Sequence, residues 1–187
     1  MDNRFSLLEK EIIKILPKSP LIFELKHAQL TLKWLLRLNP DADEALRISA
    51  LAHDIERAIT GITEKDLKEY SGINQFKKEH AKRSAKIVIN MMKKYHYGKH
   101  NLEKVKRLIE SHEVGGNKEQ NILMEADSLA YFDYNVPHYF RRYGDKRTKE
   151  KIQFMYKRLS NKAQCLVRKI KFNKKVKALF ECAISEL

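Results

Sequence analysis

The 187-residue sequence predicts an all-helical protein, and three observations favour this fold class. Leu, Ile, Lys, Glu and Ala dominate the composition, and only 6 Gly and 4 Pro interrupt it. Apolar residues recur every three or four positions, which is the spacing of one helix face, and no stretch reads convincingly as a strand. No internal repeat or low-complexity linker divides the chain. We therefore predict one helical domain over residues 1–187, large enough for a full hydrophobic core.

Two helices are predicted before residue 40. The first carries an apolar stripe and stops at Pro17. Ser19-Pro20 suits the cap and first turn of the second, which ends at Asn39-Pro40. His27 lies near the margin of the buried face of this second helix. Taken alone, it is an ordinary core or edge histidine.

Residues 46–61 are predicted to form one core-facing helix that ends near Gly61, a glycine suited to a left-handed C-cap. Asp41 followed by Glu44 resembles a capping box at its start. His53 and Asp54 stand side by side in the middle of this helix. A buried carboxylate beside an imidazole is costly unless something pairs with both, and a divalent metal does so. The alternative is that His53 and Asp54 lie at the solvent-exposed edge of an amphipathic helix.

Three further candidate ligands lie on apolar faces of later helices. His80 shares one side of a helix predicted over about residues 76–95. His112 continues the apolar positions of the next helix, and Asp127 falls on the buried side of the helix after that. Residues 145–187 read as two or three amphipathic helices.

The ordered set of candidate ligands is more informative than any single member. Polar residues on the core side of successive helices are costly one at a time, but they become favourable if they converge on a metal inside the bundle. With this order the chain resembles the HD superfamily of metal-dependent phosphohydrolases over roughly residues 20–135, which implies an HD-type core at about 20–140. The matching residues are His27, His53, Asp54, His80, His112 and Asp127.

The resemblance implies a metal site and a reaction. Asp54 would bridge two metals. His27, His53 and Asp127 would bind one of them, and His80 and His112 would bind the other. If His80 or His112 points elsewhere, the site holds one metal. In such a site metal-bound water attacks phosphorus. Ligands of this type suit one or two divalent Fe, Mn, Co, Ni or Zn ions better than Mg or Ca.

One departure from the family concerns the residues after the His-Asp pair. Many members carry a Lys, Glu or Asp there for phosphate binding or proton transfer, whereas this chain has Glu56 and Arg57. We treat Asp54, Glu56 and Arg57 as candidate catalytic residues, and Arg57 also as a phosphate ligand. An exposed Arg–Glu pair is the alternative. Further candidates for phosphate contacts are Lys82, Arg83 and Lys86.

The charge of the chain leaves a second class of function open. Residues 141–187 form a predicted basic helical extension with 15 Lys and Arg against 4 Asp and Glu, or +11 of the formal net charge of +14. The positive charge of this segment indicates either an anionic partner or helix faces that are simply exposed to solvent. The aromatic run at 131–140 serves either as core packing or as one wall of a base-stacking pocket.

We therefore expect a metal-dependent phosphohydrolase that acts on a phosphate ester or phosphoanhydride, with a nucleotide or dinucleotide as the expected small phosphorylated substrate. Among two-metal relatives, the chain resembles the bacterial hydrolases of symmetrical diadenosine tetraphosphate. The alternative is a basic helical nucleic-acid-binding module with a structural or relict metal site. A metal-dependent nuclease would combine the two readings.

The sequence has no apolar run near 18 residues and no signal-peptide pattern. These observations predict a cytoplasmic protein without a membrane partner. Cys165 and Cys182 are expected to be reduced, partly buried thiols.

Overall fold

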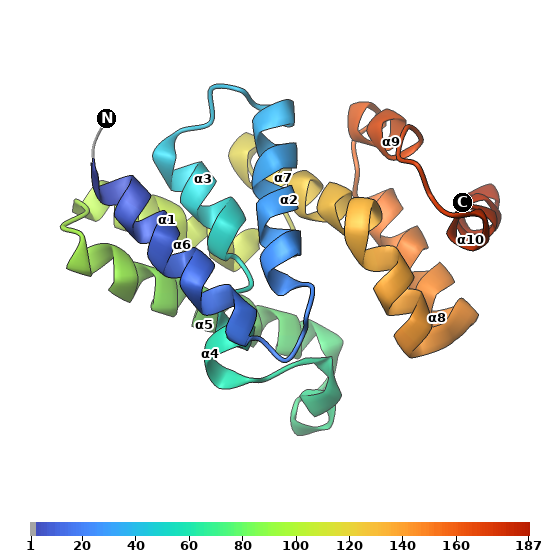
Figure 1. Ribbon diagram of the computed structural model, residues 1–187, viewed down its shortest axis with the longest axis horizontal. Helices are drawn as coiled ribbons and strands as arrows, with labels where there is room; N and C mark the ends of the chain where they lie inside the picture. The colour runs from blue at the N-terminus through green and yellow to red at the C-terminus, as the bar shows by residue number, and fades with distance from the viewer. Residues whose placement is uncertain (1–2) are drawn as a thin grey trace.

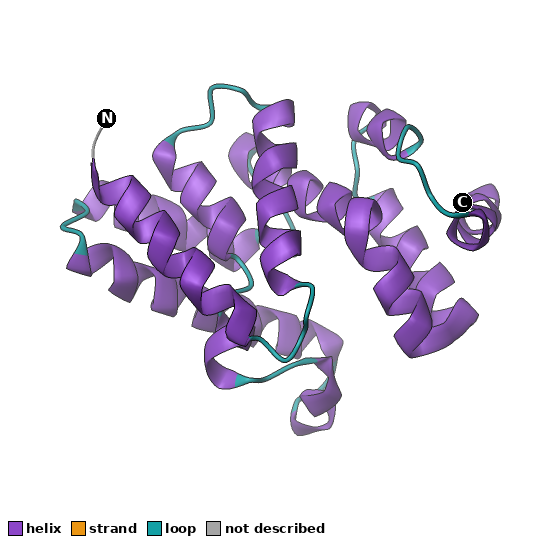
Figure 2. Cartoon of the chain, in the orientation of Figure 1, coloured by secondary structure: helices purple, strands orange, loops and turns teal. Residues whose placement is uncertain are grey.

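The computed structural model describes residues 3–187 and confirms the all-α prediction, because this part of the chain contains no strand (Figures 1 and 2). None of its helices is both long and apolar enough to cross a membrane. The α-helices are α1 (Asn3–Ile15), α2 (Glu24–Leu38), α3 (Glu44–Ala52), α4 (Glu56–Thr60), α5 (Ile73–Lys94), α6 (Lys99–Ser111), α7 (Lys118–Ala130), α8 (Val136–Lys157), α9 (Asn161–Val167) and α10 (Lys174–Ser185). Three short helical segments of other types are η1 (Leu16–Lys18), η2 (Glu64–Glu69) and η3 (Tyr131–Asn135).

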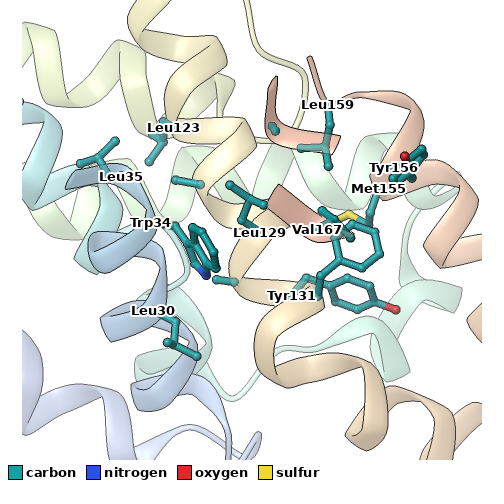
Figure 3. Close-up of a cluster of buried hydrophobic side chains, with 14 of the residues drawn as sticks. Leu30, Trp34, Leu35, Leu123, Leu129, Tyr131, Met155, Tyr156, Leu159 and Val167 are labelled. Atoms are coloured by element: carbon teal, nitrogen blue, oxygen red, sulfur yellow. The ribbon is translucent and has the colours of Figure 1, made fainter. Parts of the chain in front are cut away.

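The helices enclose two apolar clusters. One is built mainly by α1, α3, α5 and α6, and it contains Ile12, Ile48 and Val88. The other lies between α2, α7 and the C-terminal helices, and Figure 3 shows Trp34 and Leu129 within it. Residues next to the candidate ligands belong to both clusters, so the ligand set is held by packing from both sides.

The basic C-terminal segment is part of this core. Helix α8 has two arms that meet at Gly144, where φ is 73° and ψ is −174° (Figure 1). That conformation is almost exclusive to glycine, so Gly144 lets the second arm turn away from the first. Helix α10 packs on α8 and buries Phe180 beside Phe132 and Tyr156. The apolar face of the predicted extension thus completes the second cluster.

The prediction of one continuous helix over residues 46–61 is wrong in one respect, because the helix is broken in the middle. Helix α3 ends at Ala52 and α4 begins at Glu56. Across this break the backbone forms tighter three-residue turns, with Ile55 N–H donating to Ala52 O and Arg57 N–H donating to Asp54 O. The His53-Asp54 pair therefore lies at a corner rather than within a helix. The C-cap at Gly61 is confirmed, with φ of 73°.

Three smaller predictions also need correction. The cap of α3 is Asp43, whose side chain accepts the Leu46 N–H, and not Asp41. Helix α2 begins at Glu24 rather than at Ser19, because Ser19 Oγ forms a local turn by accepting the Leu21 N–H. Both thiols are exposed, since α9 and α10 bury other faces.

Candidate metal centre

The six predicted metal ligands come together in the interior. His27 comes from α2, His80 from α5 and Asp127 from α7. The other three occupy helix ends, with His53 and Asp54 at the corner after α3 and His112 at the end of α6. Their exposed fractions are 8% or less. A helix end releases its side chains from the helix spacing, so residues adjacent in sequence can point to one centre.

The ligand atoms form two groups that share Asp54. One group is His27, His53 and Asp54, and the other is Asp54, His80 and His112, with all ligand atoms in each group within 4.8 Å of one another. The Nε2 atoms of His27 and His53 lie 3.3 Å apart, and Asp127 Oδ1 is 3.1 Å from His27 Nε2. Asp54 Oδ1 lies 2.7 Å from His80 Nε2 and 3.7 Å from His112 Nε2.

Hydrogen bonds on the far side of the imidazoles orient three of the four histidines. His53 Nδ1 lies 3.1 Å from Ala50 O, and His112 Nδ1 lies 2.7 Å from Ile109 O. Because a carbonyl only accepts, each Nδ1 must carry a proton, so in the neutral form of each ring the lone pair of Nε2 faces the centre. His80 Nδ1 donates to Glu56 Oε2 at 2.7 Å. Such partners are typical of histidines that ligate metals.

Two arginines hold the ligand carboxylates. Arg57 contacts Asp54 and also donates to Glu24 Oε1 at 3.2 Å. Burial opposes ionisation of Asp54, but Arg57 and His53 outweigh it and lower the pKa of this carboxyl well below its usual value. On the other side, Arg158 donates to Asp127 Oδ2 at 2.5 Å. Burial again opposes ionisation, but hydrogen bonds from His27 and His53, together with Arg158, lower the pKa of Asp127. Both ligands are therefore anionic near neutral pH.

Electrostatics also separates the histidines. Burial favours a neutral His53, yet the carboxylates of Asp54 and Asp127 raise its pKa to about 9. The pKa of His112 is shifted in the opposite direction, because burial and the nearby His53 lower it to about 4. The centre therefore contains a basic imidazole beside a neutral one, and a metal that bound His53 would displace a proton.

A cavity opens directly beside this cluster. Asp127 continues into Tyr131 and Asn135 along one wall, because η3 is a π-helical segment that joins α7 to α8 without a break. The second arm of α8 supplies the facing wall with Lys151 and Arg158. Single π-helical turns occur frequently at functional sites. The cavity thus connects the ligand cluster to the C-terminal helices.

The other predicted site residues fall in different places. Arg57 lines the cavity, but its guanidinium is engaged by Glu24 and Asp54. Glu56 is fully buried behind His80, and it also accepts from Arg83 Nε at 2.6 Å, so it orients a ligand and does not line the cavity. The structure does not bring the basic residues of α5 to the cavity, since Lys82 pairs with Glu79 at the surface and Lys86 is exposed.

Several residues of the site were not predicted from the sequence. Glu24 lies three residues before His27, on the same side of α2, and Glu113 follows His112 directly. Lys151 and Arg158 are seven residues apart, which is two helical turns and places them on one face. That spacing is visible in the sequence, but nothing there indicates that this face turns back toward α7.

The fold and the cluster together define a class of protein: a single all-helical domain whose buried His and Asp side chains could hold a metal ion. The chain belongs to the family described as Domain of unknown function (DUF4202), whose model matches residues 12–180. This match includes α8, α9 and most of α10. No curated protein and no solved structure matches the chain.

Proposed function

We propose that this protein is a metal-dependent phosphohydrolase of the HD type, acting on a small phosphate ester or phosphoanhydride such as a nucleotide. The observation that carries the proposal is the position of Asp54, whose carboxylate belongs to both ligand groups in a buried cluster that opens to a cavity. The order of the ligands along the chain matches the HD pattern, and the far-side hydrogen bonds of the histidines suit metal ligation.

The roles of the protein groups follow from their contacts. His27, His53 and Asp127 would hold one divalent transition metal, His80 and His112 a second, and Asp54 both. Such metals lower the pKa of water and polarise phosphoryl oxygens. Arg57 and Arg158 fix the two ligand carboxylates, and Glu56 fixes the ring of His80. These three residues are positioning residues in this proposal.

Turnover by the metal-loaded protein tests the proposal. Protein purified without chelators is analysed for Mn, Fe, Co, Ni and Zn, and is then assayed with phosphate monoesters, diesters and dinucleotides. We expect close to two ions per chain and metal-dependent release of phosphate or nucleotide. Asp54→Asn should abolish turnover with the fold retained, whereas Asp41→Asn, at an exposed position, should not. A metal-loaded wild type that hydrolyses none of these substrates would contradict the proposal.

A second candidate function rests on the exposed lysines of the C-terminal helices. Lys169, Lys171, Lys174 and Lys175 are all exposed around the connection from α9 to α10. Such a run favours a nucleic-acid backbone as partner. Binding to single- and double-stranded oligonucleotides at several salt concentrations tests this candidate. A steep loss of affinity with salt that is unchanged in Asp54→Asn would favour it over the enzyme.

A further inference from the structure

The arginines beside the ligand cluster already have partners within the protein. Arg57 is shared by Asp54 and Glu24, and Arg158 by Asp127 and Glu113. Their side chains are at most 14% exposed. A guanidinium that compensates buried carboxylates is not free to neutralise an incoming anion. Neither arginine is therefore the main contact for a substrate phosphate.

Lys151 is different, because it lines the same cavity without such a partner. Within residues 3–187 no ion pair or hydrogen bond involves its ammonium group, which lies 5.9 Å from the ring centre of Tyr131 and 5.8 Å from that of Phe154. Burial and the neighbouring Lys77 lower the pKa of Lys151. Glu113 and Glu64 also line the cavity and act on this pKa in the opposite direction, but neither forms an ion pair with the ammonium group. A partly buried cation without an ion-paired carboxylate is costly, and an anion bound in the cavity would reduce that cost.

Two polar atoms on the facing wall also lack partners. Tyr131 is 4% exposed and Asn135 is 8% exposed, and neither Tyr131 Oη nor Asn135 Oδ1 has a hydrogen-bond partner. Both residues line the cavity, one and two turns beyond Asp127. In Figure 3 the Tyr131 hydroxyl points away from Trp34 and Leu129. Buried polar atoms are normally paired, so these two indicate a ligand that supplies hydrogen bonds.

We propose that Lys151, Tyr131 and Asn135 form the substrate subsite next to the metal centre. Lys151 binds a phosphate oxygen, while the Tyr131 hydroxyl and the Asn135 amide bind hydroxyl or amide groups of the organic part. The substrate class is a phosphate ester of a polar small molecule, such as a nucleoside or a sugar, and not a plain aryl or alkyl phosphate. This inference rests on the proposed function and gives the basic C-terminal segment a part in it.

Binding of inorganic phosphate to the metal-loaded protein tests the role of Lys151 without turnover. Lys151→Met removes the charge and keeps the length of the side chain, and Lys82→Met is the matched surface control. Loss of one charge-assisted hydrogen bond should weaken phosphate binding by about ten- to 100-fold in calorimetry, with no change in the control. Unchanged affinity at wild-type metal content would overturn the assignment. A wild type that neither binds phosphate nor hydrolyses any ester would instead contradict the proposed function itself.

A second measurement on the wild type does not depend on how the variant folds. Lysine acetylation by a small reagent is followed residue by residue with mass spectrometry, with and without saturating phosphate. Phosphate should slow the modification of Lys151 several-fold and leave Lys82 unaffected. Equal rates at Lys151 in both conditions would overturn the inference.

Tyr131→Phe tests the organic part of the subsite, because it removes only the hydroxyl. The probes are the four ribonucleoside 5′-monophosphates and glucose 6-phosphate, with phenyl phosphate as the plain ester. For the best polar substrate kcat/KM should fall by about fivefold or more, as for one neutral hydrogen bond, while phenyl phosphate stays within about twofold. Equal effects on both kinds of substrate, or no effect on either, would contradict the role of Tyr131.

Discussion

Metal affinity should depend steeply on pH, and His53 determines how steeply. Its pKa is about 9 in the protein without metal, because Asp54 and Asp127 outweigh burial. A metal binds the neutral imidazole, so below pH 9 each unit of acidification weakens binding about tenfold for one displaced proton. Between pH 8 and pH 6 this residue alone accounts for about 100-fold. His80, whose pKa is also raised, adds to the slope, whereas His112, at about 4, adds nothing above pH 5.

The same shift affects stability in the opposite direction when no metal is bound. The folded pKa of His53 lies above its unfolded value of about 6.5, so its protonation stabilises the fold fully below pH 6.5 and no longer does so above pH 9. A shift of this size corresponds to about 3 kcal/mol. Urea unfolding of the chelator-treated protein should show the decrease, and the metal-loaded protein should not.

Competition titrations against a coloured chelator at pH 6, 7 and 8 measure the slope of the logarithm of metal affinity against pH. We expect a slope between 1 and 2. Replacing the exposed His100 with Gln should leave it unchanged. A slope below one-half, or a chelator-treated protein that becomes more stable from pH 6.5 to pH 9, would refute the electrostatic reasoning.

Three further predictions concern the second ligand group and the C-terminal helices. His112→Ala should lower the metal content from about two ions to about one by elemental analysis, and an unchanged content would make His112 merely structural. Gly144→Ala should lower the free energy of unfolding by about 1–3 kcal/mol, because only glycine adopts its φ and ψ without strain; an unchanged urea midpoint would contradict this. Phe180→Ala should lower the free energy of unfolding by about 3–5 kcal/mol, with the whole protein still unfolding in a single urea transition. A loss confined to a separate transition would make the C-terminal helices an independent unit.

The sequence predicts most of the helices and the buried positions of the candidate ligands, since both depend on local patterns. Apolar spacing identifies the helices, and a polar residue that interrupts an apolar face, such as His80 or Asp127, is recognisable one position at a time. The candidate ligands converge because each helix buries the face that the pattern marks. What the pattern misses is the corner at His53 and Asp54, where the turn depends on the fit of α3 and α4 against other helices.

The phosphate contacts predicted on α5 do not line the cavity, for a related reason. Lys82 and Lys86 are exposed on α5, because a helix that turns His80 inward turns these neighbours outward. Arg83, three residues after His80, instead contacts the buried Glu56. Apart from Arg57, the cations that line the cavity, such as Lys151 and Arg158, come from a segment far along the chain. Their positions depend on how α8 turns back at Gly144, and a long-range return of this kind leaves no periodic signal in the sequence.

The ion pairs around the centre have a consequence for how metal and substrate affect one another. The network that joins the ligand carboxylates to their partners has five acidic groups and four basic groups, so with neutral imidazoles it carries a net charge of −1. Its members are Asp54, Asp127, Glu24, Glu56, Glu113, Arg57, Arg83, Arg158 and Lys77.

With two divalent ions bound to neutral imidazoles, the same network would carry a charge of +3 in a region with little water, and Lys151 adds one more positive charge nearby. An anion then becomes the natural counter-charge of the loaded centre. Because coupling between two ligands is reciprocal, phosphate should tighten metal binding by the same factor by which metal tightens phosphate binding. The balance of paired charges in the interior thus ties the occupancy of the centre to the presence of its substrate.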